Sequence, residues 1–543
     1  MDLVGKPTAL NIHAAEQESG RMSPVPSLAS TYSPLASPKL SPLGTADSDP
    51  FHLRRESRSQ LLTNKPFPAL TKIICTIGPA TNNVNMISAL IEEGMNCARL
   101  NFSHGTHEYH ASVITTVRQS VSQSKRLCAI MLDTKGPEIR TGKIAGGKEV
   151  SLTKGQTFRL ECGQEIEGGS DRVWVQYANL PKVLKVGSRV LIDDGLIEMR
   201  VTALEDSVVV CEVLNPGSLG STKGVNLPGA VVDLPAVTAK DIDDIRFGVA
   251  QGVDFIAASF VRNADCVTTI RKILDDAGGK GIKIISKIEN QEGMDSFEEI
   301  LAVSDGIMVA RGDLGVEIPI EQVALAQKMM IKKCNIAGKF VVTATQMLDS
   351  MIVNPSPTRA EASDVANAVF DGTDCVMLSG ETAKGKYPVA AVKMMSMIVR
   401  EAEGNIDYLA TFNAIRSWAP DTISIGESIS SSAVKSAFDL KASLLVVLTE
   451  SGTTARQVSK YRPHVPVLCI TANEQTARQA LLSRGLLPLL VGSMIGSDSL
   501  IGRVVGVAKK LGMCQKGDIV VATVGTMEGK PGTTSQVKVV NVL

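Results

Sequence analysis

Eight short apolar runs that alternate with amphipathic stretches constrain the fold of this chain more than any other feature. Stretches between the runs, such as Asn85–Gly94, Ala239–Gly252 and Ile320–Gly338, carry apolar residues at helical spacing. Strands and helices that alternate in this way over this length are typical of a closed barrel rather than an open doubly wound sheet. We therefore predict the α/β class and a (β/α)8 (TIM) barrel, with strands that begin at Lys72, Asn96, Cys128, Val253, Lys283, Gly306, Phe340 and Asp374.

A segment of different character, from about Pro137 to Pro235, interrupts the alternation between the third and fourth runs. Residues there alternate in strand fashion, turn signals such as Asp193-Asp194-Gly195 occur, and helical periods are few. We predict an all-β domain, inserted over the end of the barrel where active sites form, that acts as a lid. Its strands are expected at Glu149–Leu152, Arg172–Tyr177, Val190–Ile192 and Ser207–Glu212.

The alternation restarts after about Asn405 and predicts a separate, smaller α/β domain. Its strands are expected at Ser443–Leu448, Val467–Ile470, Asp518–Val524 and Ser535–Val542. The domain plan that follows is a disordered tail over 1–68, the first part of the barrel over 69–136, the inserted β-rich lid over 137–236, the second part of the barrel over 237–404 and a C-terminal α/β regulatory domain over 405–543.

The first 68 residues are rich in Ser, Pro and Ala and have little periodic apolar content, which is typical of disorder. Ser-Pro dipeptides start at Ser23, Ser33, Ser37 and Ser41, and Ser57 follows two arginines and a glutamate. A solvated tail is one interpretation. The other is regulation by protein kinases, above all at Ser57, where an added phosphate changes the charge of the tail.

Composition excludes several classes of partner and site. The chain has 543 residues and 44% hydrophobic content, and its 56 Lys and Arg balance 56 Asp and Glu, so no net field favours nucleic acid or an anionic membrane. Its ten cysteines include no Cys-x-x-Cys pair, which favours buried thiols in a reducing compartment over zinc or disulfides. No apolar run approaches the length of a membrane span, and a cytoplasmic location is expected.

Opposite charges stand at the ends of two neighbouring strands. Lys287 and Glu289 lie two residues apart at the end of the fifth run, so their side chains point to the same face. Asp313 follows the sixth run, beside Gly312, where backbone can approach a ligand closely. A structural ion pair is one interpretation; the other is a site where two carboxylates hold a divalent cation and the lysine stabilises a phosphoryl oxygen.

Polar side chains follow most of the other strands as well. Because functional residues of such barrels come from the C-terminal ends of the strands, a rim of polar groups predicts an active site there. The second run supplies Arg99, Asn101, Ser103 and His104, the third Asp133, Thr134 and Arg140, the seventh Thr345, and the eighth Ser379 and Glu381.

Seven motifs resemble those of pyruvate kinase, in the same order, from about Thr71 to the C-terminus. They are A-R-L-N-F-S-H-G, D-T-K-G-P-E-I-R-T-G, K-G-V-N-L-P-G, I-I-S-K-I-E-N, M-V-A-R-G-D-L-G, A-T-Q-M-L and M-L-S-G-E-T-A-K-G. The resemblance implies transfer of the phosphoryl group of phosphoenolpyruvate to ADP, giving pyruvate and ATP, the last step of glycolysis. It also implies Mg²⁺ (or Mn²⁺) and K⁺ as cofactors, and a homotetramer.

The resemblance further implies a role for each rim residue. Lys287 would neutralise the phosphoryl group in flight, Arg99 would clamp it, and Glu289 and Asp313 would ligate Mg²⁺. Asp313 and Gly312 also count as substrate-binding residues, and the backbone near Ala310–Gly312 with Thr345 would seat the substrate carboxylate. The remaining roles are K⁺ at Asn101, Ser103, Asp133 and Thr134; the nucleotide at Asn101, Ser103, His104, Arg140 and Lys223; and proton delivery through water near Thr345, Ser379 and Glu381. Glu138 matches the acid found in the K⁺-dependent members of the family, where K⁺-independent members have lysine.

Regulation is where the chain departs from the family pattern. The sugar-bisphosphate loop of regulated members resembles Thr449–Thr454 here, but Glu450 stands in place of their lysine and Gly496 in place of a tryptophan. We therefore expect weak or absent activation by fructose 1,6-bisphosphate. The effector residues that the resemblance implies are Thr449, Ser451, Gly452, Thr453, Thr454 and Arg503; in the amino-acid pocket Asn96 and Arg126 match, but Leu481 replaces a histidine.

Two other functions are compatible with a barrel of this kind. One is a non-catalytic scaffold protein, which the presence of Lys287, Glu289 and Asp313 disfavours. The other is a metal-dependent aldolase or lyase, which handles an enolate without a nucleotide; the lid and Arg140 favour the kinase over it.

Overall fold

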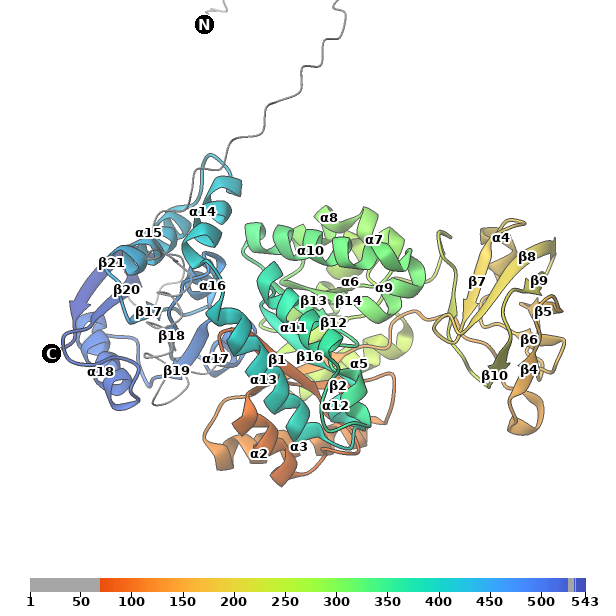
Figure 1. The fold of residues 1–543 in the computed structure, drawn as a ribbon, viewed down its shortest axis with the longest axis horizontal. Coiled ribbons are helices and arrows are strands. Elements are labelled where there is room, and N and C mark those ends of the chain that lie inside the picture. The colour runs from red at the N-terminus through yellow and green to blue at the C-terminus, as the bar shows by residue number, and fades with distance from the viewer. Residues whose placement is uncertain (1–68, 526–531, 533) are drawn as a thin grey trace, which may run out of the picture. The chain divides into compact units, whose positions relative to one another are not determined.

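The computed structural model describes residues 69–525, 532 and 534–543 (Figure 1). The predicted tail, with Ser57 and the four Ser-Pro sites, lies outside the described residues. In the described part of the chain, no helix is long and apolar enough to cross a membrane. All ten cysteines are free and buried, as predicted.

A closed barrel of eight parallel strands confirms the predicted fold class. Strand β1 closes the ring because it pairs with both β2 and β16. The order around the ring is β1-β16-β15-β14-β13-β12-β3-β2. The strands are β1 (Lys72–Thr76), β2 (Met95–Asn101), β3 (Ala129–Asp133), β12 (Phe255–Ala258), β13 (Lys283–Ile288), β14 (Gly306–Ala310), β15 (Phe340–Ala344) and β16 (Cys375–Leu378).

Helices cover the outside of the barrel because the strands are apolar on both faces (Figure 1). Side-chain caps fix where several helices begin: Asn83 caps α2, and Thr238 and Thr358 form capping boxes at α5 and α11. The helices are α2 (Val84–Glu93), α3 (His107–Ser124), α5 (Ala239–Ala250), α6 (Ala264–Asp276), α7 (Gln291–Asp295), α8 (Phe297–Val303), α9 (Arg311–Glu317), α10 (Val323–Ala337), α11 (Arg359–Asp371), α12 (Gly380–Ala383) and α13 (Pro388–Gly404).

The interior of the barrel is a packed core. Alternate residues of its strands, such as Ile74, Phe255 and Met308, form one buried cluster. Leu481 and Leu482, which follow helix α17 (Glu474–Ala480) of the C-terminal domain, belong to the same cluster. The end of the barrel where the strands begin is therefore packed against the C-terminal domain.

The inserted segment forms two sheets with a hydrophobic core of their own, which includes Phe158, Val190 and Val209. One sheet has the order β11-β7-β8-β9-β5-β6, and the other pairs β10 with β4. The predicted strands correspond to β4, β6, β7 and β9, whereas β5, β8, β10, β11 and a single-turn helix, α4 (Leu180–Val183), were not predicted. The strands are β4 (Val150–Leu152), β5 (Thr157–Glu161), β6 (Arg172–Trp174), β7 (Arg189–Ile192), β8 (Ile197–Glu205), β9 (Val208–Val213), β10 (Gly217–Leu219) and β11 (Val225–Asn226).

The C-terminal domain is a five-stranded sheet of order β19-β18-β17-β20-β21, with a buried cluster on each face. Its edge strand β19 was not predicted, because Pro488 interrupts the run and proline is typical of edges and turns. The elements are α14 (Tyr408–Trp418), α15 (Ile425–Asp439), β17 (Leu444–Leu448), α16 (Thr453–Lys460), β18 (Val467–Thr471), α17 (Glu474–Ala480), β19 (Leu486–Leu490), α18 (Ser497–Lys510), β20 (Ile519–Gly525) and β21 (Thr534–Asn541).

Buried ion pairs join this domain to the barrel. Arg462 Nη1 lies 2.6 Å from Asp374 Oδ1, and both side chains are 4% exposed. Asp374 also accepts hydrogen bonds from the backbone of Val341 and Arg484. Arg478 Nε lies 2.9 Å from Asp254, whose pKa burial raises to about 6. These charges stand where the barrel strands begin, and they serve stability.

We predict that Arg462→Met destabilises the protein by about 3–5 kcal/mol, because it leaves Asp374 as an unpaired buried carboxylate. Urea unfolding at neutral pH measures the change. Lys435→Met is the control, since the pair between Lys435 and Asp439 is exposed and should contribute at most about 1 kcal/mol. Equal losses in the two variants would contradict the prediction.

A second prediction concerns Lys72, a lysine 1% exposed whose Nζ donates to Leu486 O at 2.8 Å. Burial lowers its pKa to about 8, against an opposing effect of Glu403. The unfolded chain, with a lysine pKa of about 10.4, therefore binds more protons between these two values, and stability rises with pH across that interval. Between about pH 7.5 and pH 9.5 the free energy of unfolding should rise by roughly 2 kcal/mol more in the wild type than in Lys72→Met. Parallel pH profiles would contradict this.

Candidate active site

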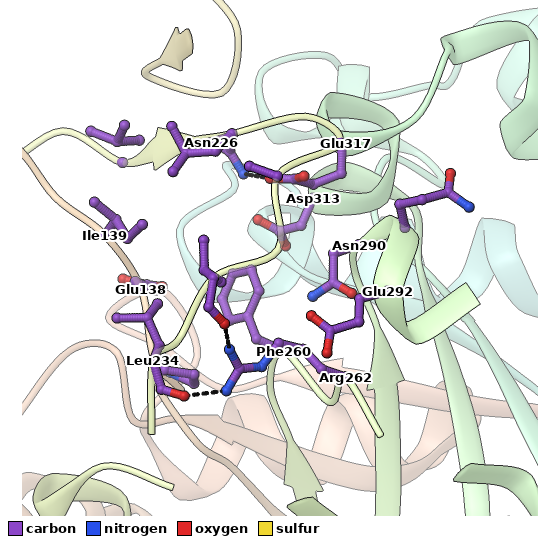
Figure 2. Close-up of a pocket in the computed structure, with 18 of the residues that line it drawn as sticks. Glu138, Ile139, Asn226, Leu234, Phe260, Arg262, Asn290, Glu292, Asp313 and Glu317 are labelled. Carbon is purple, nitrogen blue, oxygen red and sulfur yellow. Dashed lines mark hydrogen bonds between the residues drawn. The ribbon is translucent and has the colours of Figure 1, made fainter. Parts of the chain in front are cut away.

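A cavity of about 420 Å³ lies between the inserted domain and the C-terminal ends of the barrel strands (Figure 2). Residues from both sides line it. Glu138, Arg140, Asp193, Asp194, Lys223 and Asn226 come from the inserted domain and its hinge, and Phe260, Arg262, Asn290, Asp313 and Glu317 come from the barrel.

Lys287 is the centre of a buried charge network next to this cavity. Its Nζ lies 3.1 Å from Asp133 Oδ1, 3.0 Å from Glu289 Oε1 and 2.7 Å from Ser259 Oγ. Burial acts to lower the pKa of Lys287, but the carboxylates of Asp133 and Glu289 outweigh it and raise the pKa above its ordinary value. The ammonium group therefore stays charged at neutral pH. As predicted, Lys287 and Glu289 point the same way.

Arg99 extends the network. Its Nε lies 2.6 Å from Asp133 Oδ2, and its Nη1 donates to Thr76 Oγ1 at 2.9 Å. Burial raises the pKa of Asp133, but Arg99 and Lys287 lower it below its ordinary value. Asp133 thus bridges the two cations and keeps them close to each other in spite of their repulsion.

Glu289 has one oxygen available for a cation. Its Oε2 accepts the backbone N–H of Phe260 at 2.5 Å, whereas Oε1 is buried and, although close to Lys287, lacks hydrogen-bond geometry. Burial acts to raise the pKa of Glu289, the carboxylate of Asp313 adds to this rise, and the ammonium group of Lys287 opposes it. Two carboxylates that repel each other around an unsatisfied oxygen fit a hard divalent cation.

Asp313 lies in the first turn of α9, and the loop beside it is tightly packed. A Cβ on Gly312 would meet Thr345 Cγ2 at 2.8 Å, so only glycine fits there. Thr345 has φ 75°, which is strained for a β-branched residue, as at many functional sites. Arg311 holds this turn, because Nη2 donates to Thr345 O at 2.7 Å and Nη1 pairs with Asp364.

The other predicted rim residues divide into two groups. Asn101 and Ser103 lie together, since Asn101 Oδ1 accepts the Ser103 N–H. Thr134 follows β3, the strand that pairs with β2, and accepts hydrogen bonds from Ser259. Glu381 is instead occupied by the backbone, because its carboxylate accepts the N–H groups of Ser379 and Leu348. Glu381 therefore positions two loops at the rim.

The predicted nucleotide residues lie toward the inserted domain. Arg140 pairs with Glu138 at 2.6 Å and donates to Thr222 O, and Lys223 pairs with Asp193 at 2.8 Å. His104 lies after β2, where its carbonyl oxygen contacts His110 Nε2. Arg140, Lys223 and Asp313 are thus the predicted site residues that line the cavity itself.

The predicted effector residues are all in the C-terminal domain. Thr449, Ser451 and Gly452 form the turn between β17 and α16, where Thr449 Oγ1 accepts the Gly452 N–H at 3.0 Å. Thr453 and Thr454 begin α16, and Arg503 lies on α18. The structure therefore does not bring them to the barrel cavity.

Sequence reasoning missed several residues of the network and of the α9 turn, among them Ser259, Arg311 and Thr76, which accepts a hydrogen bond from Arg99. Ser259 ends the fourth apolar run with a hydroxyl, a signal that the rim prediction could have used. Arg311 gave no signal, because its partners Thr345 and Asp364 are distant in sequence.

Comparisons with known proteins agree with this geometry. The family model described as "Pyruvate kinase, barrel domain" matches residues 69–392, and "Pyruvate kinase, alpha/beta domain" matches 427–540. A pyruvate kinase of Dictyostelium discoideum is 53% identical over 496 residues, which cover 90% of this chain and 98% of that protein. The human pyruvate kinase PKLR is 50% identical over 488 residues, which cover 87% of this chain and 85% of that protein.

Among solved structures, a crystal structure of a pyruvate kinase from Cryptosporidium parvum matches with a TM-score of 0.84 and 46% identity. The match covers 88% of this chain and 96% of that one. Because family models match both the barrel and the C-terminal domain, and relatives are about half identical over most of the chain, the chain belongs to the pyruvate kinase family.

Proposed function

We propose that this chain transfers the phosphoryl group of phosphoenolpyruvate to ADP and releases pyruvate and ATP. The observation that carries this proposal is the buried ammonium of Lys287, held charged by Asp133 and Glu289 and flanked by Arg99 at the rim of the barrel. Phosphoryl transfer requires positive charge and positioning around the equatorial oxygens more than it requires covalent help.

Lys287 and Arg99 are the two cations that face the migrating group. Both are fixed before substrate arrives, because Asp133 holds them by hydrogen bonds from opposite sides. Charge that is already oriented in a water-poor site stabilises a transition state without further reorganisation. Thr345 and the backbone at Gly312 are the seat for the substrate carboxylate, since they form the tight turn next to Asp313.

Glu289 and Asp313 would hold Mg²⁺ or Mn²⁺. The unsatisfied Glu289 oxygen and the repulsion between the two carboxylates are what support this assignment. The ion would supply Lewis-acid stabilisation of substrate oxygens when bound. Asn101, Ser103, Asp133 and Thr134 would hold K⁺, as a set of neutral and anionic oxygens at the ends of β2 and β3.

Arg140, Lys223 and His104, with Asn101 and Ser103, are the groups that we assign to the nucleotide. Lys223 belongs to the inserted domain, so nucleotide binding and closure of that domain are coupled. For protonation of the enolate we assign Thr345, with Ser379 and Glu381 as the residues that hold the neighbouring loop.

Assembly and regulation complete the proposal. We infer a homotetramer, which the exposed apolar side chains of Ile320, Leu325 and Val353 support. The scaffold and lyase alternatives are disfavoured by the intact charge network and by the relatives at about half identity. We keep weak or absent activation by fructose 1,6-bisphosphate as an expectation, because Glu450 lies in the effector loop.

Lys287→Met should lower kcat by on the order of a hundredfold or more, about 3 kcal/mol, because it removes a preorganised positive charge. A coupled assay for pyruvate measures the rate, and isothermal titration checks that phosphoenolpyruvate still binds. Lys283→Met is the matched control: it removes a lysine from the opposite end of the same strand, where Lys283 pairs with Asp305. Undiminished turnover with bound substrate would remove the role assigned to Lys287.

Wild-type activity should depend on K⁺, and Glu138→Lys should abolish that dependence, because the new ammonium supplies a positive charge near the site. Steady-state rates in potassium salts and in tetramethylammonium salts of equal ionic strength measure the effect. Glu138→Gln, which removes the acid without adding a cation, should still require K⁺. A K⁺ requirement that persists in Glu138→Lys would contradict the assignment.

A further inference from the structure

A hydrogen bond joins the inserted domain to the barrel at the rim of the cavity. Asn226, the last residue of β11, donates from Nδ2 to Glu317 Oε1 at 2.9 Å (Figure 2). Asn226 is 91 residues distant from Glu317 in sequence. A backbone hydrogen bond at Leu227 also acts on the Glu317 carboxylate. The donors on this carboxylate thus come from the inserted domain.

Glu317 and Asp313 share one short helix. They are four residues apart on α9 (Arg311–Glu317), so their side chains lie on the same face of the helix. Both line the cavity, and Figure 2 shows them on the same side of it. Any force on Glu317 from the inserted domain therefore acts on the helix that carries a proposed metal ligand.

Arg262 holds the chain that returns from β11 to the barrel at a second point. Its Nη1 donates to Val232 O at 2.6 Å, and its Nη2 donates to Leu234 O (Figure 2). Residues 226–234 are therefore fixed at both ends by barrel side chains, Glu317 at the first and Arg262 at the second. The position of β11 depends on these two anchors.

Like charges on the inserted domain and on the barrel lie across the same cavity as this contact. Asp194, in the turn before β8, lines the cavity together with Asp313. Burial raises the pKa of Asp194, the carboxylates of Asp313 and Asp193 raise it further, and Arg140 and Lys223 act in the opposite direction. The hydrogen bond between Asn226 and Glu317 holds the inserted domain to the barrel beside these like charges.

We propose that Glu317 is a positioning residue for phosphoryl transfer: through the hydrogen bond from Asn226 it holds the inserted domain closed over the substrate and fixes the helix that carries Asp313. This inference rests on the proposed function and names two residues that set the geometry of the same site. Closure that completes a catalytic site affects kcat and the KM of the substrate held by the lid.

The two substrates should respond differently. Lys287 and Thr345, assigned to phosphoenolpyruvate, belong to the barrel outside α9 and keep their places when the contact is lost, whereas Gly312 and Asp313 belong to α9 itself. Lys223, assigned to ADP, belongs to the inserted domain. Loss of the contact should therefore lower kcat and raise KM for ADP more than KM for phosphoenolpyruvate.

The test is a double-mutant cycle on the full-length protein with Asn226→Ala, Glu317→Ala and both changes together. Each single change should lower kcat/KM for ADP roughly tenfold, the size expected for one hydrogen bond to a charged group. The double variant should be no worse than either single one, since both remove the same contact. Glu317→Gln should recover most of the activity, because its amide oxygen can accept from Asn226.

Asn215→Ala is the matched control. Asn215 makes hydrogen bonds to Glu198 N and Leu196 O inside the inserted domain, and it does not line the cavity. It should leave kcat/KM for ADP within about twofold of the wild type, as surface changes usually do. Thermal unfolding of every variant shows whether a loss of activity reflects a loss of folding.

Three results would overturn the inference: Glu317→Ala with the kinetics of Asn215→Ala, single effects that add in the double variant, or a loss that falls equally on both substrates and follows thermal stability. Failure of the proposed function looks different, because a wild type that forms no pyruvate from phosphoenolpyruvate and ADP refutes it before any variant is compared.

Discussion

The balance of charge around Lys287 is the interaction on which the site depends. A buried ammonium is costly unless anions surround it, and here Asp133 and Glu289 reach it from β3 and from the end of its own strand. Asp133 also holds Arg99, so one carboxylate brings two cations to the same place. The barrel makes this possible, because strands that are distant in sequence end side by side.

The two ends of the barrel use buried charge for different purposes. Where the strands begin, Asp374 and Asp254 are paired with Arg462 and Arg478 of the C-terminal domain and are satisfied by backbone amides. Where the strands end, Glu289 keeps an unsatisfied oxygen beside a cavity. Satisfied charges stabilise the junction between domains, and unsatisfied ones are available to a ligand.

The inserted domain adds charged side chains to the cavity next to the Lys287 network. Lys223 contributes a positive charge, and Asp194 contributes a negative charge that lies near the carboxylate of Asp313. The return strand of the inserted domain is held by Glu317 and Arg262, which belong to the barrel. These polar contacts join the inserted domain to the barrel at the rim of the cavity.

Periodicity in the sequence was sufficient for the eight barrel strands and for the β character of the inserted segment, because alternation and helical spacing are local properties. It did not predict strands β5, β8, β10 and β11 within that segment. Strand β19 was missed because Pro488 hid a local pattern, and Ser259 because one strand end was overlooked. The sequence alone determined which charges stand on the rim. Only the tertiary structure decided which of them meet: Glu381 turns to backbone amides, Arg311 holds Thr345, and Asn226 contacts Glu317, since these hydrogen bonds depend on how distant segments pack.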